Sequence, residues 1–394
     1  MATIRKRGDA YQIRVSTGYD TNGRHKEQAM TWKPEPGMTE KQIKKELNRQ
    51  AVMFEEKCAH GYCAKAIKFQ DLAEEWFEQY AAFNLRHTTY DRLSKLRKRI
   101  YSAIGHLRID KLSTRQLQAF VNSMAQEGAN MRNGKPLAPK TIRHHLSLIS
   151  DIYSYAVRMD MVSDNPCSRV VIPKGEVKEK EIYTQDEMMQ LLELLMKEPL
   201  KYRTFFFLIA YSGFRRSEML GLEWKDIDWE NHLISVRRTS NYVPKIGIYT
   251  DTTKTRYSQR TIKLADEIMD MLREWQDEQA QQALAMGDKW VETDRIFTRP
   301  DGRPLDTNGP YSWLKKLCEE NELPFYGIHT FRHFTASSMI AGGMDVATVS
   351  GALGHANVST TLNVYTHQFQ TAQARVYGVM NSVFGFRQAA ASGA

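Results

Sequence analysis

The chain has 394 residues, of which 42% are hydrophobic, and 55 lysines and arginines against 46 aspartates and glutamates give a formal net charge of +9. At roughly 150 residues per domain, this length predicts two or three domains, and the basic excess favours a polyanionic partner. The four cysteines (Cys58, Cys63, Cys167 and Cys318) are too few and too scattered for a disulfide framework. No apolar run approaches the roughly 18 residues of a membrane span, so a soluble, cytoplasmic protein is expected.

Basic residues are unevenly distributed along the chain. Residues 81–115 carry nine lysines and arginines against two aspartates, and residues 135–145 carry basic side chains with no acid between them. Such runs either contact the phosphates of a polyanion or form solvated helix faces, and the pattern alone fits both interpretations. The residues of these runs predicted to contact phosphates are Arg86, Lys95, Arg97, Lys98, Arg99, Lys140, Arg143 and His144.

The first 62 residues are predicted to form a small module of short strands and one helix. Apolar and polar side chains alternate over residues 11–15, and the turn-rich stretch 18–23 follows. Thr39 then provides a polar cap for an amphipathic helix expected to end near residue 57. Arg5 and Arg14 lie on the predicted strands, which makes a sheet that contacts a nucleic-acid groove plausible.

A helical region is predicted next. From Phe69 to Val162 apolar residues recur at spacings of three and four, which is typical of amphipathic helices. The glycine- and proline-containing stretch 128–139 is expected to be a loop, and Asp164-Asn165-Pro166 is expected to end the last helix. The charged, proline-broken stretch 171–178 is typical of a linker. We therefore predict domains over residues 1–62, 67–170 and 176–394.

The third region is expected to be mixed. A helix capped at Thr184 opens it, strands are predicted at 234–238 and 260–264, and helical pieces divided by glycines lie between about 307 and 370. The chain as a whole is therefore predicted to be a multidomain α+β protein.

Five short motifs follow one another in this third region and are informative as an ordered set. They are SGFRRSE at 212–218, TKTR at 253–256, HTFR at 329–332, LGH at 353–355 and TTLNVYTH at 360–367. The spacing of three in HTFR places its histidine and arginine on one helix face, and the glycine of LGH suits a helix C-terminus. The residues of these motifs with basic or phenolic side chains that stand out are Arg215, Lys254, His329, Arg332, His355 and Tyr365.

This series resembles the tyrosine recombinase (lambda-type phage integrase) family, whose signature is arginine, lysine, histidine-x-x-arginine, histidine and tyrosine in that order. By position, the resemblance implies that Arg215, Lys254, His329, Arg332, His355 and Tyr365 are the catalytic residues. Ser212 stands where the family more often has threonine, and Glu218 matches a frequent family acid that we interpret as structural. The closest layout is that of integrases of conjugative transposons and temperate phages. The resemblance implies a three-stranded arm-binding domain, an all-helical SAM-like core-binding domain, and a mainly α catalytic domain with a small antiparallel sheet and a C-terminal tail.

The predicted clamp residues fit the chemistry of phosphodiester transfer, which builds negative charge on the non-bridging phosphate oxygens. The planar guanidinium groups of Arg215 and Arg332 can each donate two parallel hydrogen bonds to such oxygens. His355 would supply a further donor, and removal of one such donor typically costs about 3 kcal/mol in the transition state.

Proton transfer is the second requirement of this chemistry. Tyr365, a phenol with a free pKa of about 10, would attack the phosphate with help from a base such as His329, and Lys254 would protonate the departing 5′ oxygen. The division of roles between Lys254 and His329 stays open. The scheme needs no metal and no other cofactor. The cluster Cys58, His60 and Cys63 has no obvious fourth ligand nearby, so no zinc site is predicted.

The resemblance implies a site-specific recombinase that cuts and rejoins DNA at attachment sites through a 3′-phosphotyrosine, and so integrates and excises a mobile element. It also implies duplex DNA as partner, a homotetramer on DNA, an excisionase, a host DNA-bending protein and a bacterial, nucleoid-associated location. A chromosome-dimer resolvase or a topoisomerase with the same chemistry is an alternative. A DNA-binding regulator that keeps the fold without cutting is another.

Overall fold

The computed structural model describes residues 2–19, 23–59, 67–175, 181–252, 259–355, 357–359 and 361–362. The predicted catalytic residues Lys254 and Tyr365, His60 and Cys63 of the cysteine cluster, and the C-terminal tail lie outside the described residues. The chain divides into two compact units, Met1–Val177 and Lys178–Ala394. The finer domain boundaries at 1–62, 67–170 and 176–394 stay a prediction.

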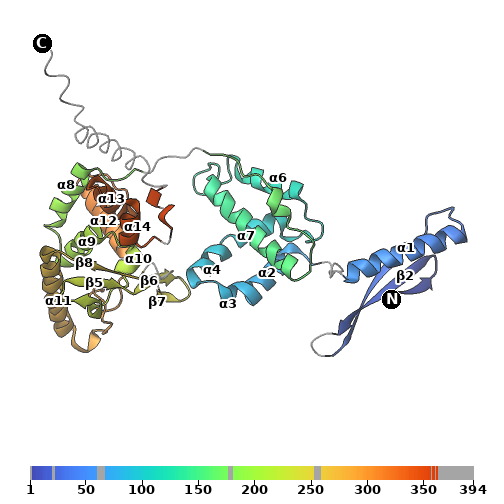
Figure 1. Ribbon diagram of the computed structural model, residues 1–394, viewed down its shortest axis with the longest axis horizontal. Coiled ribbons are helices and arrows are strands. Elements are labelled where there is room, and N and C mark those ends of the chain that lie inside the picture. The colour runs from blue at the N-terminus through green and yellow to red at the C-terminus, as the bar shows by residue number, and fades with distance from the viewer. Residues whose placement is uncertain are drawn as a thin grey trace, which may run out of the picture. The chain divides into compact units, whose positions relative to one another are not determined.

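A three-stranded antiparallel sheet with one helix packed against it forms the N-terminal module (Figure 1). Its elements are β1 (Thr3–Arg7), β2 (Ala10–Tyr19), β3 (His25–Trp32) and α1 (Glu40–Ala59), with β2 as the central strand. The predicted alternation places Ile13 and Val15 of β2 against Leu47 and Phe54 of α1 in a small buried cluster. At the start of α1 the Thr39 hydroxyl and the Gln42 side chain form a reciprocal cap, as the sequence predicted.

The region from residue 67 to residue 175 is helical, with a core of its own. Its elements are α2 (Phe69–Trp76), the π-helical turn η1 (Phe77–Ala81), α3 (Ala82–Asn84), α4 (His87–Ser94), α5 (Arg97–Ile100), the π-helical turn η2 (Tyr101–Gly105), α6 (Thr114–Met124), α7 (Pro139–Arg158) and the 3₁₀ turn η3 (Pro166–Arg169). The predicted loop over residues 128–139 is confirmed up to residue 138. Pro139 is already the first residue of α7, because proline is compatible with the first position of a helix.

The end of the last helix was predicted wrongly. It was expected at Asp164-Asn165-Pro166, whereas α7 ends at Arg158. The reason is local, because Asp160 adopts a left-handed backbone conformation (φ +53°) that stops the helix. Asn165 instead opens η3, where its side-chain oxygen accepts a hydrogen bond from the Cys167 backbone N–H.

The second unit is mainly helical with small antiparallel sheets. Its helices and turns are α8 (Gln185–Leu195), α9 (Leu200–Ser212), α10 (Arg216–Met219), η4 (Trp224–Asp226), α11 (Asp266–Met286), η6 (Gly287–Lys289), α12 (Gly309–Glu320), α13 (His329–Ala341) and α14 (Val346–Leu353). Its strands are β4 (Ile227–Asp228), β5 (Leu233–Val236), β6 (Arg238–Val243), β7 (Gly247–Thr252) and β8 (Arg260–Lys263). Strands β4, β5 and β8 form one sheet in that order, while β6 and β7 form a separate hairpin.

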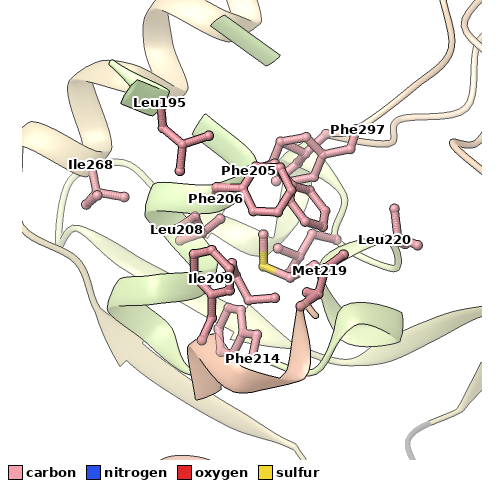
Figure 2. Packing of buried hydrophobic residues seen from close by; sticks show 14 of the residues in the cluster. Leu195, Phe205, Phe206, Leu208, Ile209, Phe214, Met219, Leu220, Ile268 and Phe297 are labelled. Atoms are coloured by element: carbon pink, nitrogen blue, oxygen red, sulfur yellow. The ribbon is translucent and has the colours of Figure 1, made fainter. Parts of the chain in front are cut away.

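The core of this unit is built around α9. Figure 2 shows Phe205, Phe206 and Ile209 of α9 packed with Phe214 and Phe297 in one apolar cluster, and all five are at most 1% exposed. Burial of such large side chains contributes roughly 1.5–3 kcal/mol each. Helix α9, which leads into the SGFRRSE motif, is therefore held in place by the hydrophobic core of this unit.

Taken together, the described part of the chain confirms the predicted fold class: a multidomain, mainly helical α+β protein with a three-stranded N-terminal sheet. Across these described residues, no helix combines the length and the apolar composition that crossing a bilayer requires.

Candidate active site

The loop between α9 and α10 positions the first candidate, Arg215. Gly213 ends α9 in the left-handed conformation (φ +63°), and the chain then turns so that Arg215 precedes the first residue of α10. Glu218, one turn into α10, accepts hydrogen bonds from the Arg215 backbone N–H (2.9 Å) and from its Nη1 (2.6 Å). The Glu218 side chain is only 1% exposed, so it holds Arg215 from inside the protein.

A second arginine shares the Glu218 carboxylate. Arg260, at the start of β8, donates from Nη2 to Glu218 Oε2 at 3.0 Å, and its guanidinium lies 4.8 Å from the centroid of the Phe214 ring. Burial alone would raise the pKa of Glu218, but the charges and hydrogen bonds of Arg260 and Arg215 outweigh it and hold that pKa below its ordinary value. Glu218 is thus an ionised, buried anchor for two arginines.

The second candidate clamp residue, Arg332, lies on α13 and is 2% exposed. Its Nη1 donates to the Gly213 carbonyl at 2.8 Å and its Nη2 donates to the Leu353 carbonyl at 2.7 Å. Arg215 Nη2 in turn donates to the Gly354 carbonyl at 3.0 Å. These carbonyls belong to the C-terminal ends of α9 and α14, where a helix carries partial negative charge and unpaired acceptors. Two helix ends therefore hold the two arginines side by side.

His355 follows directly after the end of α14. Gly354 caps that helix in the left-handed conformation (φ +67°), as the sequence predicted. Burial, with the positive charges of Arg332, Arg215 and Arg260, lowers the pKa of His355 to about 4. The imidazole is consequently neutral at pH 7, and its Nδ1 lies 2.7 Å from the Thr361 hydroxyl oxygen.

His329, the first residue of α13, lines a cavity of about 540 Å³. Arg215, Tyr311 and Tyr326 line the same cavity. The ring of His329 meets the ring of His333, one turn along α13, edge to face at a centroid distance of 4.9 Å. An open, basic cavity of this kind can receive an anionic group.

The structure thus places four of the six predicted catalytic residues in the second unit, where Arg215, Arg332 and His355 are close neighbours through the ends of α9 and α14. His329 opens the helix that carries Arg332 and lines the cavity that Arg215 also lines.

Two buried polar groups of the site were not predicted. Arg260 was assigned only to a strand, and a lone basic residue at a strand start carries no signal that it is buried. Thr361 belongs to the TTLNVYTH motif, but only its distance from His355 shows its relation to the site. Val358 and Ser359 are helical, and the Asn357 side-chain oxygen accepts a hydrogen bond from the Ser359 backbone N–H.

The basic residues predicted to contact phosphates differ in their surroundings. Arg97 donates to Glu74 at 2.8 Å and lies over the Phe77 ring, while Arg99 donates to the Ala129 carbonyl at 2.6 Å. These two arginines are therefore held within the helical region.

Others of that set point outward. Lys98, Lys140 and Arg143 are exposed. Lys95, also exposed, follows the last residue of α4 and pairs with Asp91 of that helix, and Arg86 is half-buried. His144 is half-buried, and burial together with Arg92 and Lys140 lowers its pKa. In the N-terminal module Arg5 is exposed, and Arg14 lies 3.5 Å from Glu27.

Comparison with known proteins places this fold and site in a class. The chain matches the phage integrase family over residues 181–371 and the phage integrase N-terminal SAM-like domain over residues 68–125. A tyrosine recombinase XerC-like protein of Caldanaerobacter subterraneus subsp. tengcongensis is 26% identical over 95% of this chain and 96% of its own length. The ICEBs1 integrase of Bacillus subtilis is 26% identical over 67% of this chain and 69% of its own length.

Solved structures show the same fold. The Tn1549 transposon integrase in complex with transposon right end DNA superimposes with a TM-score of 0.67 at 20% identity, over 80% of this chain and 100% of that one. A lambda integrase dimer bound to a COC′ core site superimposes with a TM-score of 0.56 at 14% identity, over 92% of this chain and 93% of that one. The class defined by fold and site is that of the tyrosine recombinases. Within it, the chain belongs to the phage integrase family.

Proposed function

We propose that this protein is an integrase that cuts and rejoins DNA at attachment sites through a 3′-phosphotyrosine intermediate, and thereby integrates and excises a mobile element. The observation that carries the proposal is the convergence of Arg215, Arg332 and His355 at the C-terminal ends of α9 and α14. Together, two guanidinium groups and a neutral imidazole form a site that can bind an anionic phosphate.

The proposed roles follow from the chemistry of each group. Arg215 and Arg332 neutralise the non-bridging oxygens of the scissile phosphate, and His355 donates a further hydrogen bond. The Tyr365 phenolate oxygen forms the new bond to phosphorus while the bond to the 5′ oxygen breaks.

Protons move at the two ends of this displacement. The 5′ oxygen leaves with a proton, for which Lys254 is the proposed donor, and His329 is the proposed acceptor of the Tyr365 proton. Reversal of the same step by a new 5′ hydroxyl rejoins the strand, so bond energy is conserved and no cofactor takes part.

The proposed partner is duplex DNA, held by more than one part of the chain. The N-terminal sheet module would bind arm sites, and the helical region would close on core sites together with the catalytic unit. Integrases with this fold have been seen in complex with circular intermediate DNA and, for lambda integrase, as a tetramer bound to a Holliday junction. We infer a tetramer on DNA here too, assisted by an excisionase and a host DNA-bending protein in the bacterial cytoplasm.

The test is trapping of a covalent adduct. The wild-type protein and Tyr365→Phe are incubated without metal with labelled DNA that contains a candidate attachment site and a nick beside the cleavage point, then separated by denaturing electrophoresis. A DNA-linked protein band is expected for the wild type and not for Tyr365→Phe.

Two control variants sharpen this test. Tyr311 and Tyr326 line the same cavity as Arg215 and His329, so they are alternative tyrosines at the site. Tyr311→Phe and Tyr326→Phe should retain the adduct. If either of these variants lost the adduct while Tyr365→Phe retained it, the substituted tyrosine would be the nucleophile instead of Tyr365.

The rival functions give different outcomes. A DNA-binding regulator would bind its true site tightly and form no adduct with any variant. A topoisomerase would relax supercoiled DNA that lacks an attachment site, and a chromosome-dimer resolvase would recombine without any need for residues 1–62.

A further inference from the structure

The Thr361 hydroxyl is buried next to a catalytic histidine. Thr361 is 0% exposed, and its Oγ1 lies 2.7 Å from His355 Nδ1. Burying a hydroxyl without a hydrogen-bond partner costs about 1–3 kcal/mol, so this contact satisfies a group that would otherwise destabilise the fold. It also restrains the orientation of the imidazole ring, because a ring nitrogen accepts or donates along a direction in the ring plane.

The protonation state of His355 gives the contact chemical meaning. Burial and the positive charges of Arg332, Arg215, Arg260 and His329 lower the pKa of His355 to about 4 and keep the imidazole neutral at pH 7. A neutral imidazole has one N–H donor and one bare acceptor nitrogen. A phosphate oxygen is only an acceptor, so His355 can assist phosphoryl transfer only if the nitrogen that faces the phosphate carries the proton.

The Thr361 hydroxyl can set this choice. When it donates to Nδ1, the single ring proton must reside on Nε2, which is then a donor toward the phosphate. In the opposite arrangement Nδ1–H donates to the hydroxyl oxygen, and Nε2 presents a lone pair that repels the phosphate.

The position of Thr361 in the sequence relates it to the proposed nucleophile as well. It lies six residues after His355 and four residues before Tyr365, in the segment that leads to the proposed nucleophile. A hydrogen bond from this segment to His355 therefore ties the start of the nucleophile-bearing segment to the phosphate-binding site.

We propose that Thr361 is a positioning residue that donates to His355 Nδ1, holds the histidine as its Nε2–H tautomer, and so orients it as a donor to the scissile phosphate. This inference rests on the proposed function of the site.

The kinetic test compares single-turnover cleavage of the nicked DNA by the wild type and five variants, His355→Gln among them. Thr361→Val, which keeps the shape and removes the hydroxyl, is expected to slow cleavage by about 10-fold to 100-fold with little change in DNA affinity. Thr361→Ser, which keeps the hydroxyl, should restore most of the rate. In a His355→Gln background, Thr361→Val should cause no further loss, because the two residues act as one unit. Thr204→Val, another buried threonine that donates to the Met271 carbonyl away from the site, should cleave at the wild-type rate.

Equal losses from Thr361→Val in both backgrounds, or a wild-type rate for Thr361→Val, would overturn the proposal. A second measurement needs no activity: nitrogen NMR of histidine-labelled full-length protein without DNA, with the His355 signals assigned from His355→Gln. We expect a bare Nδ1 and a protonated Nε2 in the wild type and a mixture of tautomers in Thr361→Val. A protonated Nδ1 in the wild type would refute the positioning role even if cleavage occurs. A wild type that shows the expected tautomer but never forms an adduct would refute the proposed function alone.

Discussion

Arg332 donates a hydrogen bond of 2.8 Å to the peptide carbonyl of Gly213, which lies 119 positions earlier in the chain. Gly213 thereby has two functions, because it also turns the chain out of α9 toward Arg215. The other terminal nitrogen of Arg332 donates to Leu353 at the end of α14. One buried guanidinium thus joins two helix ends, and the geometry of the site depends on a backbone conformation that glycine adopts without strain.

Substitution of Gly213 by alanine should therefore damage both stability and activity. A Cβ at this position would lie 2.8 Å from Leu353 Cδ2, and the backbone has a φ of +63°. We expect the free energy of unfolding to fall by about 2–4 kcal/mol, from the left-handed conformation together with the steric overlap. Gly247→Ala is the matched control, because its φ is +86° but no atom lies within 4 Å of the added Cβ.

Urea denaturation of both variants separates the two contributions. Gly247→Ala should lose only the backbone part, about 1–2 kcal/mol. Equal losses in the two variants would mean that the contact with Leu353 contributes nothing.

Replacing Glu218 by glutamine should expose its role as a buried counter-charge. Removal of one partner of a buried ion pair typically costs about 3–5 kcal/mol, and here two arginines, Arg215 and Arg260, would lose it. Glu274→Gln is the control. The Glu274 side chain is 61% exposed and pairs with Arg203, so this surface ion pair should contribute less than about 1 kcal/mol to stability.

The effect of Glu218 should also depend on pH with a defined sign. Its pKa is lowered in the folded state, so its stabilisation is fully present above the ordinary value of 4.5 and is lost as the pH falls through the folded pKa. Urea denaturation should show a difference in the free energy of unfolding between the wild type and Glu218→Gln that is constant above about pH 5. This difference should become smaller at lower pH. A difference in the free energy of unfolding that grows in acid would contradict an ionised Glu218.

Local signals in the sequence predicted the elements of the site better than its contacts. The helix after Thr184 was predicted from its cap, and the structure contains the full reciprocal cap with Glu187. The C-terminal glycine of α14 was predicted in the same way, because a glycine after an apolar helix signals the left-handed conformation within a few residues of sequence.

Several interactions that position the side chains are non-local and escaped prediction. The Arg215 bond to Gly354 spans 139 residues, and the Arg260 bond to Glu218 spans 42. No spacing rule links such residues, since their contact is a result of how α9, α14 and β8 pack. Sequence patterns also treat every lysine and arginine alike, so the buried Arg260 could not be told from an exposed one.

The lowered pKa of His355 predicts a loss of stability in mild acid. Between the ordinary histidine value of 6.5 and about 4, the unfolded chain binds a proton that the folded protein excludes. The stability advantage of the wild type over His355→Gln should therefore be constant above pH 7 and should decrease as the pH falls from 6.5 toward 4. Thermal or urea denaturation of both proteins across this range checks the sign. A difference that does not vary with pH would mean that His355 titrates alike in the folded and unfolded states.

Arg143 and Arg97 should respond in opposite ways to truncation, although the sequence predicted the same role for both. Arg143 is exposed on α7, in a stretch without acidic residues, so it is available to a DNA phosphate. Arg97 instead donates to Glu74 at 2.8 Å and covers the Phe77 ring at 4.5 Å. Each phosphate contact releases about one counterion, so Arg143→Ala should lower the slope of log affinity against log salt by about 1.

Fluorescence anisotropy with core-site DNA over a range of NaCl concentrations measures this slope for both variants. Arg97→Ala should leave the slope unchanged and lower the stability of the helical region instead, because its guanidinium already has a carboxylate and an aromatic ring as partners. A reduced slope for Arg97→Ala would mean that DNA displaces Glu74 and takes over its arginine. An unchanged slope for Arg143→Ala would exclude this face of α7 from the DNA interface, since an exposed arginine at a phosphate must release counterions when it binds.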